Sequence, residues 1–231
     1  MTTVLITGAN RGLGLEFTRQ FLGTGWRVFA GCRNPGEAKE LQAVAAKSQG
    51  TVTVHCVDVK DFGQIDALAH ELRDQSIDVL LNNAGVYGPQ GARLGQMDYA
   101  AWEEVLKVNT LAPYKMAESF LENVARSQKK VIVGITSELG SIGHNETGGH
   151  VIYRSSKAAL NMAMKTLAIE VRKRGIIVAV LHPGWVQTDM GGPQAPLKPA
   201  DSIRGMLKVI NALRLQDTGK FFGHDGKEIP W

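Results

Sequence analysis

A tyrosine and a lysine four residues apart, Tyr153 and Lys157, are the side chains in this sequence best suited to proton transfer. Residues at this spacing share one face of a helix, so an ammonium group would lie beside a phenol. With an unperturbed pKa of about 10, tyrosine is a poor acid or base near neutral pH, but an adjacent positive charge lowers that pKa. The pair predicts acid-base catalysis, although the same spacing also suits a packed ring with a lysine that reaches solvent.

The second feature that could take part in the chemistry is a glycine-rich turn at 7–14, with the sequence Thr-Gly-Ala-Asn-Arg-Gly-Leu-Gly. It follows a short apolar run and precedes a helical pattern, so backbone amides and the helix dipole can face a pyrophosphate with no side chain in the way. A tight turn that needs glycine for its backbone angles is the structural alternative. We predict a dinucleotide at this turn. The residues expected to contact it here are Gly8, Asn10, Arg11, Gly12, Leu13 and Gly14.

The hydrophobic pattern indicates the scaffold that must position these groups. Short β-branched runs alternate with helical patterns, which is typical of right-handed β-α-β units around a parallel sheet. Six of the runs are continuously apolar, as strands buried on both faces are. We predict strands at 3–7, 27–32, 51–57, 79–82, 130–135, 176–182 and 220–222. We predict helices at 13–22, 36–47, 62–74, 99–127 and 151–174, a further helix near Pro199, and a break in the fourth helix at Pro113.

Three loops with little periodicity follow predicted strands, at 87–96, 139–149 and 184–198. In open α/β sheets, ligands bind outside the carboxyl ends of the strands, where such loops gather. Their glycine and proline content fits surface loops that can approach a ligand. We therefore expect these loops to approach a bound ligand.

In the types and order of these features, the chain resembles the short-chain dehydrogenase/reductase family over essentially its whole length. The resemblance rests on the glycine turn, on Asn-Asn-Ala-Gly at 82–85 after the fourth strand, and on Tyr-x-x-x-Lys. It also rests on Ser137, sixteen residues before Tyr153, and on Pro183-Gly184 after the sixth strand. It implies an α/β fold, a single Rossmann-like doubly wound domain over 1–231 with a seven-stranded, mostly parallel sheet. It also implies a nicotinamide cofactor across the strand ends.

The resemblance also assigns roles to individual residues. Tyr153 would protonate the carbonyl oxygen during reduction, or act as the base in the reverse direction, and Lys157 would also hydrogen-bond the nicotinamide ribose. Ser137 would donate a hydrogen bond to the substrate oxygen as negative charge develops there. Asn109 matches an asparagine that holds a water in the proton relay, although it could simply cap a helix break. The remaining implied cofactor contacts are Asp58, Val59, Asn83, Ala84, Gly85, Tyr153, Lys157, Pro183, Gly184, Val186 and Thr188.

The charge pattern beyond the glycine turn favours NADP(H) over NAD. An acidic residue about 20 residues past such a turn usually accepts the ribose hydroxyls of NAD and would repel a 2′-phosphate. This chain has Ala-Gly-Cys-Arg at 30–33, with no carboxylate. Arg33 and Arg11 could instead clamp the phosphate with forked donors, although each alone could be a solvent-facing loop residue. Asp58, assigned by resemblance to the adenine, could equally cap a helix.

Two branches of the family resemble the last third of the chain, in the stretch 182–192 and the ending Gly-Lys-Glu-Ile-Pro-Trp. These are the bacterial C-factor proteins, which implies intercellular signalling, and the sniffer-type carbonyl reductases, which implies NADPH-dependent carbonyl reduction. We favour the enzyme, because a binding module has no need of all four catalytic residues together. Only about ten residues separate Met190 from the next helix, so we expect a short lid and broad specificity for small apolar aldehydes and ketones. The expected lining residues are Tyr87, Leu139, Ile142 and Trp185.

Composition excludes several other classes of function. The net charge of +4 is modest, and lysines and arginines are spread along the chain, unlike a nucleic-acid footprint. Cys32 and Cys56 have no metal-site spacing, so we expect no metal. With no secretory pattern and no apolar run near the ~20 residues that span a bilayer, we expect a cytoplasmic protein. The long helices at 99–127 and 151–174 match the family's dimerisation pair and imply a homodimer or homotetramer.

Overall fold

Seven parallel strands lie side by side at the centre of the computed structural model, which describes residues 1–91 and 93–231. Residue 92, within the predicted loop 87–96, lies outside the described residues. The strand order is β3-β2-β1-β4-β5-β6-β7, and each neighbouring pair is parallel. The strands are β1 (Thr3–Thr7), β2 (Arg27–Cys32), β3 (Val52–Cys56), β4 (Val79–Asn82), β5 (Val131–Ile135), β6 (Ile177–His182) and β7 (Lys220–Gly223). The predicted Rossmann-like sheet is confirmed.

The helices follow the strands in the predicted alternation. They are α1 (Gly12–Gly23), α2 (Lys39–Lys47), α3 (Phe62–Glu71), α4 (Tyr99–Leu106), α5 (Ala112–Ser119), α6 (Leu121–Ala125), α7 (Val151–Val171) and α8 (Pro199–Ala212). Single turns of 3₁₀-helix are η1 (Pro35–Glu37), η3 (Glu138–Gly140), η4 (Arg172–Arg174) and η5 (Leu215–Asp217). The predicted helix 36–47 is thus shorter, because a separate turn at η1 precedes α2.

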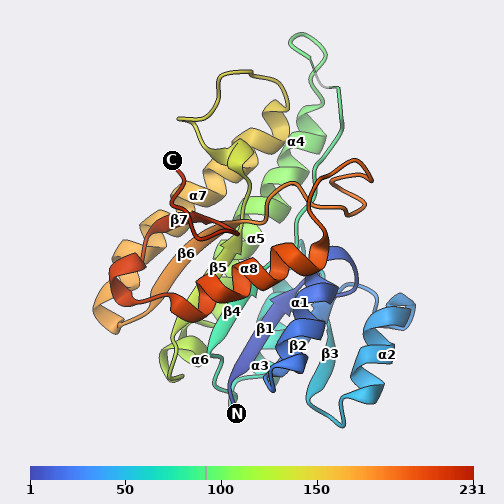
Figure 1. Ribbon diagram of the computed structural model, residues 1–231, viewed down its shortest axis with the longest axis vertical. Helices are drawn as coiled ribbons and strands as arrows, with labels where there is room; N and C mark the ends of the chain where they lie inside the picture. Colours follow the sequence, from blue (N-terminus) through green and yellow to red (C-terminus); the bar gives the residue numbers. More distant parts are fainter. Residues whose placement is uncertain (92) are drawn as a thin grey trace.

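Two hydrophobic layers cover the sheet, one on each face. Side chains of successive residues in a strand point to opposite faces. Val4 and Ile6 accordingly pack in the layer with α1 and α8, whereas Leu5 packs in the layer with α3, α5 and α7. Figure 1 shows α1 and α8 lying in front of the sheet. The strand order reverses between β1 and β4, which is the place where ligands bind in sheets of this kind.

The predicted fourth helix is interrupted, as expected, but by a wide turn rather than by a kink at Pro113 itself. Residues Lys107–Leu111 form a turn of π-helix, labelled η2, and Pro113 is the second residue of α5. Such single wide turns inside helices are rare and often occur at functional sites. Pro113 has no N–H, so it cannot donate to the carbonyl of Asn109 four residues earlier. The interruption therefore changes the backbone at one of the predicted site residues.

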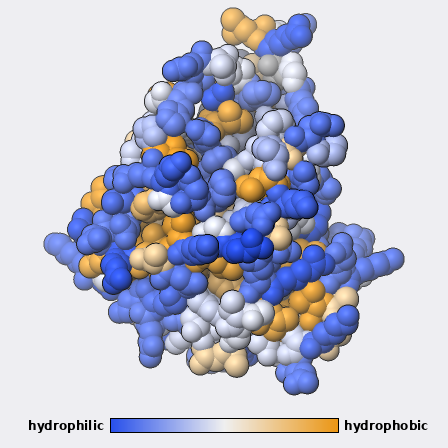
Figure 2. Space-filling view, in the orientation of Figure 1, coloured by the Kyte–Doolittle hydropathy of each residue, from blue (hydrophilic) through white to orange (hydrophobic). Residues whose placement is uncertain are grey.

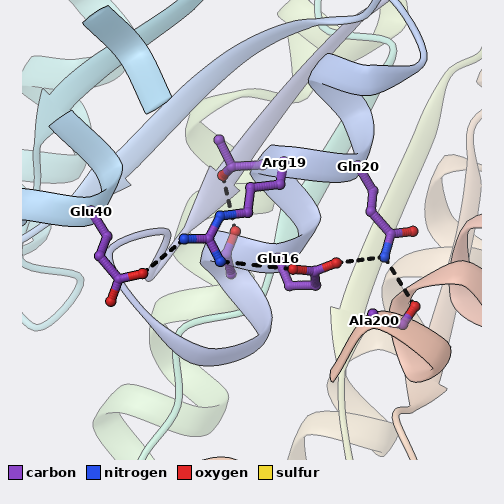
Figure 3. Close-up of polar contacts among 7 residues, drawn as sticks. Glu16, Arg19, Gln20, Glu40 and Ala200 are labelled. Atoms are coloured by element: carbon purple, nitrogen blue, oxygen red, sulfur yellow. Dashed lines mark hydrogen bonds and ion pairs between the residues drawn. The ribbon is translucent and has the colours of Figure 1, made fainter. Parts of the chain in front are cut away.

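Polar contacts tie α1, the helix that follows the glycine turn, to its neighbours on both sides (Figure 3). Arg19 donates to Glu40 of α2 over 2.7 Å. Gln20 donates to the side chain of Glu16, also over 2.7 Å, and to the backbone carbonyl of Ala200 in α8 over 2.9 Å. These contacts, with the buried face of α1, fix the position of the glycine turn at its start.

The face in Figure 2 is largely hydrophilic, with hydrophobic spots scattered over it. Within the described residues, no helix is long and apolar enough to cross a membrane. The described part of the chain also holds no cluster of three or more histidine, cysteine or acidic residues that could bind a metal ion.

Candidate active site

The glycine turn between β1 and α1 leaves room that only glycine allows. Gly8 and Gly12 have left-handed backbones, with φ of 67° and 54°. A Cβ on Gly8 would lie 3.0 Å from the Cα of Ala84, and a Cβ on Gly14 would overlap the carbonyl oxygen of Gly8. A Cβ on Gly12 would meet nothing closer than Thr188, at 3.8 Å. The turn thus presents bare backbone at the start of α1, which fits a pyrophosphate.

The carboxyl ends of β1 and β4 are fastened to each other beside this turn. Thr7 Oγ1 accepts hydrogen bonds from the backbone N–H groups of Asn83 and Ala84, both at 3.1 Å. Asn83 Nδ2 donates to the carbonyls of Thr7 and Gly8, at 2.9 and 3.2 Å. The predicted cofactor residues of the glycine turn and of the segment 83–85 therefore form one rigid unit. No local pattern in the sequence predicts this role for Thr7, because its partners lie 76 and 77 residues away in the chain.

Tyr153, Lys157 and Ser137 come together at the carboxyl end of β5, as the sequence predicts. Tyr153 and Lys157 share the inner face of α7 and are only 8% and 4% exposed. Lys157 Nζ donates to the carbonyl of Ile135 over 2.8 Å and lies 5.7 Å from the centre of the Tyr153 ring. Ser137 is the second residue after β5, and its hydroxyl lies close enough to the phenol of Tyr153 to affect the pKa of that group. The structure thus assembles a phenol, an ammonium and a hydroxyl at one strand end.

Burial, rather than the lysine, controls the phenol in this arrangement. Loss of water raises the pKa of Tyr153 well above its usual value, and the hydrogen bond from Ser137 offsets only part of this rise. Burial also lowers the pKa of Lys157, from 10.5 to about 8. We expected Lys157 to lower the pKa of Tyr153, but in this arrangement the effect of burial on the phenol is larger and the pKa rises. The phenol keeps its proton throughout the neutral range.

Asn109 connects the loop after β4 to α7 through its side-chain amide. Its Oδ1 accepts from the N–H of Val86 over 2.9 Å, and its Nδ2 donates to the carbonyl of Val86 and to Ser156 Oγ, over 2.8 and 2.9 Å. A Cβ on Gly85 would lie 3.3 Å from Asn109 Oδ1 and 3.5 Å from Lys157 Nζ. The amide is fully engaged, so a water at this residue would have to use its backbone carbonyl, which Pro113 leaves without the usual helical donor.

Buried polar side chains behind these residues fix the register of α7. Thr136 Oγ1 donates to Asn161 over 2.7 Å, Asn161 donates to the carbonyl of Gly140, and Thr110 donates to the carbonyl of Ser156. The side-chain amide of Asn82 is buried with no hydrogen-bond partner among the described residues. None of these partners could be identified from the sequence, because they are far apart in the chain.

The buried ammonium predicts an effect on stability. Lys157 has a pKa of about 8 in the folded protein and 10.5 when exposed, so between these pH values the unfolded chain binds more protons. Lys157→Met should therefore raise the free energy of unfolding at pH 7 by about 1–3 kcal/mol, after allowing for the lost hydrogen bond to Ile135. The gain should shrink as pH rises from 8 to 10.5. Urea denaturation at several pH values measures it, and a variant less stable than wild type at pH 7 would contradict the prediction.

Of the two arginines predicted to bind the 2′-phosphate, Arg11 is engaged in an ion pair in the structure. Arg33 follows β2 and is exposed, whereas Arg11 forms an ion pair with Asp189 in the loop after β6. Arg11 thus links the glycine turn to that loop instead of extending towards Arg33. The sequence pattern did not predict this pair, because 178 residues separate its members.

A hollow of about 420 Å³ opens where β3 ends, lined by Asp58, Lys60, Asp61, Phe62, Gln64 and Lys107. Val59, the second residue of the expected adenine pair, is buried beside it. Asp58 accepts from the N–H of Lys60, and it is Asp61 that caps α3, by accepting from Gly63 and Gln64. The helix-cap alternative for Asp58 is therefore wrong, and Asp58 remains available beside the hollow.

The loop after β6 carries the last group of predicted cofactor residues. Pro183 accepts a hydrogen bond from Ser202 of α8 over 2.6 Å. Gly184 has φ of 83°, and a Cβ there would lie 2.8 Å from Leu197 and 3.2 Å from His224. Val186 forms a backbone bridge with Leu197, which closes the loop on itself. Thr188 lies opposite Gly12, so this loop borders the glycine turn from the other side.

Only part of the expected apolar substrate lining faces the catalytic group. Tyr87 stacks on Tyr153, with ring centres 4.4 Å apart and planes at 17°. Ile142 and Trp185 are 77% and 58% exposed, and Trp185 donates to the carbonyl of Gly191. Leu139 lies partly buried in η3. Of the four, Tyr87 is the residue in direct contact with the predicted catalytic tyrosine.

Three histidines near the candidate site, His144, His150 and His182, each lie within reach of a polar partner. His144 Nδ1 lies 3.0 Å from Glu138 Oε1, and His182 Nε2 lies 3.8 Å from Glu138 Oε2. Burial lowers the pKa of His182 to about 4, so it is uncharged at neutral pH. His150 is hydrogen-bonded to the hydroxyl of Tyr87 over 3.0 Å.

The last residues of the chain brace the loop that follows Ser137, which the sequence did not predict. Ser141 Oγ donates to the carbonyl of Pro230 over 2.7 Å, and the N–H of Gly143 donates to the carbonyl of Trp231 over 2.9 Å. The Trp231 ring packs against Phe221 of β7, with centres 5.7 Å apart. The loop beside the catalytic serine is thereby attached to the far edge of the sheet.

Comparison with known proteins decides the family. The profile described as short chain dehydrogenase matches residues 2–197. The chain belongs to this family of oxidoreductases. Its glycine turn, Ser137, Tyr153 and Lys157 all lie within the matched residues.

Individual relatives agree with the two branches suggested by the sequence. The chain is 44% identical to the protein named C-signal of Myxococcus xanthus, over 155 residues that cover 67% of this chain and 93% of that protein. It superposes on the carbonyl reductase Sniffer of D. melanogaster with a TM-score of 0.94, at 34% identity and full coverage of both chains. It superposes on the NADPH-bound carbonyl reductase from chicken fatty liver with a TM-score of 0.92, at 34% identity, over 100% of this chain and 99% of that chain.

Proposed function

We propose that the protein is an NADP(H)-dependent reductase of small aldehydes and ketones. The observation that carries the proposal is the convergence of Ser137, Tyr153, Lys157 and Asn109 at the ends of β4 and β5, next to a glycine turn that fits a dinucleotide. Relatives at 34% identity that superpose over the whole chain are named carbonyl reductases, and one of them holds NADPH. The proposal extends that activity to this chain.

The proton-transfer step follows from the states of the four residues. A bound nicotinamide would supply the hydride. Tyr153, whose pKa burial raises, is protonated at neutral pH and can give its proton to the carbonyl oxygen. Ser137 donates a hydrogen bond to the same oxygen, and the positive charge of Lys157 stabilises the phenolate that remains.

The cofactor would lie between the glycine turn and the loop after β6. Gly8, Gly12 and Gly14 would hold the pyrophosphate, and the segments 83–85 and 183–188 would border the ribose and the nicotinamide. Lys157 would hydrogen-bond the nicotinamide ribose. Asp58 and Val59 would contact the adenine from the hollow at the end of β3.

The test of the proposal is oxidation of NADPH, followed at 340 nm, with a panel of aldehydes, ketones and dicarbonyls. We expect NADPH oxidation with several small apolar carbonyl compounds and no NADPH oxidation when the carbonyl compound is omitted. No turnover with any member of the panel would contradict the proposal. A preference of several orders of magnitude for one compound would contradict broad specificity.

The preference for NADPH should depend on Arg33. Arg33→Ala should weaken NADPH binding by about ten- to 100-fold, because hydrogen bonds to charged groups contribute about 1.5–3 kcal/mol, and should leave NADH binding unchanged. Arg11→Ala should have a smaller effect, because Asp189 already pairs with Arg11. Fluorescence titration with both cofactors measures the ratio, and Arg204→Ala, an exposed arginine on α8, is the matched control. An unchanged NADPH/NADH ratio in Arg33→Ala would overturn the assignment.

A signalling role, with turnover secondary, is the second candidate, and the 44% identity to C-signal favours it. The two candidates differ in what they need from Tyr153. A signalling protein that only binds the cofactor keeps its effect in Tyr153→Phe, whereas a reductase does not. Comparison of this variant in a cell-based signalling assay and in the 340 nm assay separates them.

We also propose that the protein is a homo-oligomer through the outer faces of α5 and α7. Met162 and Ile169, seven residues apart on α7, are each 68% exposed, and Leu111, the last residue of η2 before α5, is also exposed. Large exposed apolar side chains in such a row mark surfaces that pair with a partner. Light scattering after gel filtration gives the number of chains.

A further inference from the structure

Tyr87 covers one face of the predicted catalytic phenol. Its ring is nearly parallel to that of Tyr153, at 17°, with the centres 4.4 Å apart, which is the offset stacking that aromatic pairs favour. Tyr87 is itself half-buried, and burial raises the pKa of its phenol, so it is uncharged. A carbonyl compound therefore cannot approach Tyr153 through the face that Tyr87 occupies.

The backbone on both sides of Tyr87 is held firmly. Both backbone groups of Val86 are bound by the amide of Asn109. Gly88 has φ of 79°, and a Cβ there would lie 2.8 Å from Val105 and 3.3 Å from Ile152. The backbone is hydrogen-bonded one residue before Tyr87 and closely packed one residue after it, so this loop places the Tyr87 ring against Tyr153.

The hydroxyl of Tyr87 is held by a residue with an unusual backbone. His150 Nδ1 lies 3.0 Å from Tyr87 Oη, and the two rings meet edge to face. His150 directly precedes α7 and has φ of 48°, after Gly148 and Gly149 with φ of 63° and 71°. A left-handed backbone is uncommon for a residue other than glycine. The three consecutive left-handed residues 148–150 place the His150 side chain against Tyr87.

The space left beside this aromatic pair is small. A cavity of about 200 Å³ is lined by Tyr87, Pro89, His150, Ile152 and Tyr153, among others. Pockets for drug-sized ligands measure roughly 300–1,000 Å³. Tyr87 and Tyr153 both line this cavity, so a carbonyl compound that reaches Tyr153 through it lies against the Tyr87 ring, where a branch next to the carbonyl carbon would need additional room.

We propose that Tyr87, held by His150, is a specificity-determining residue of this site, which selects unbranched and flat carbonyl compounds over compounds branched next to the carbonyl. The inference rests on the proposed reductase function. It assigns to the loop after β4 the control of substrate shape, while Ser137 and Tyr153 carry the chemistry common to all substrates.

Two isomeric aldehydes of equal carbon number, hexanal and 2-ethylbutanal, test the proposal in the NADPH-loaded enzyme. Tyr87→Ala should raise the ratio of kcat/KM for 2-ethylbutanal over hexanal by about ten- to 200-fold, the range that one methylene group is worth in an apolar pocket. Tyr87→Phe loses the hydrogen bond to His150 but keeps the ring and its edge-to-face contact with the imidazole, so the ratio should stay within about threefold of wild type. His150→Asn removes both contacts, while asparagine tolerates a left-handed backbone, and this variant should raise the ratio at least about threefold.

The ratio of two substrates on one enzyme sample is unaffected by the fraction of folded protein, so a merely structural role of Tyr87 would not move it. Tyr99→Ala, which removes an exposed tyrosine stacked on Trp102, is the matched control and should leave the ratio unchanged. If the ratio of kcat/KM values is unchanged in Tyr87→Ala, the proposal is wrong. If it is unchanged in His150→Asn, His150 has no part in the selection of substrates. Absence of all turnover in wild type would instead signal failure of the reductase function itself.

Discussion

Tyr153→Phe should lower kcat for carbonyl reduction by about 10²- to 10⁴-fold, the range that general acid-base catalysis contributes. The variant loses only the hydroxyl, so the stack on Tyr87 and the packing of α7 are kept. NADPH binding should therefore stay close to that of wild type. Steady-state kinetics at 340 nm and a fluorescence titration with NADPH measure the two effects.

The control for this variant is Tyr114→Phe. Tyr114 also carries a hydroxyl on a helix, α5, but its partner is the surface residue Glu170, 3.5 Å away. Its removal should leave kcat within about twofold, in the range of surface substitutions away from a site. Near-normal turnover in Tyr153→Phe would remove Tyr153 as the proton donor. Loss of NADPH binding along with turnover would indicate a structural role for its hydroxyl.

Gly14→Ala should abolish cofactor binding and lower the melting temperature. The added methyl group would overlap the carbonyl oxygen of Gly8 and lie 2.6 Å from Asn83 Nδ2, so the glycine turn and its attachment to β4 would both have to move. Overpacking of this kind typically costs about 1–3 kcal/mol, and the displaced backbone could no longer follow the pyrophosphate. We expect NADPH affinity to fall by at least about 100-fold, measured by fluorescence titration beside thermal unfolding.

Gly23→Ala, at the other end of α1, is the matched control for this substitution. A Cβ on Gly23 meets nothing within 4 Å, and alanine is the better helix former. The control should bind NADPH as wild type does and should be slightly more stable. Equal affinity in Gly14→Ala and Gly23→Ala would show that the turn does not hold the dinucleotide.

The strands and the catalytic pair could be predicted from the sequence because their signals are local. A strand buried on both faces is a short apolar run, as in β1 and β6, and the run is visible without knowledge of its neighbours. The spacing of Tyr153 and Lys157 places both on one face of any helix. Helix ends were less predictable, as in α3, which ends at Glu71 rather than near residue 74.

The form of the break before Pro113 required the packed structure. The sequence predicts only that proline interrupts a helix. Whether the backbone responds with a kink or with the wide turn at Lys107–Leu111 depends on the contacts of the inner face, where Asn109 binds Val86 and Ser156. These partners lie 23 and 47 residues away in the chain.

The sequence by itself determined the family, the fold and the chemical groups of the site, since the glycine turn, the Tyr-x-x-x-Lys spacing and the strand pattern are each properties of a few neighbouring residues. Only the tertiary structure decided the rise in the pKa of Tyr153, the pairing of Arg11 with Asp189, and the cover that Tyr87 places on the phenol. The physical reason is that desolvation, ion pairing and stacking depend on distances between residues far apart in the chain. No local pattern encodes these distances.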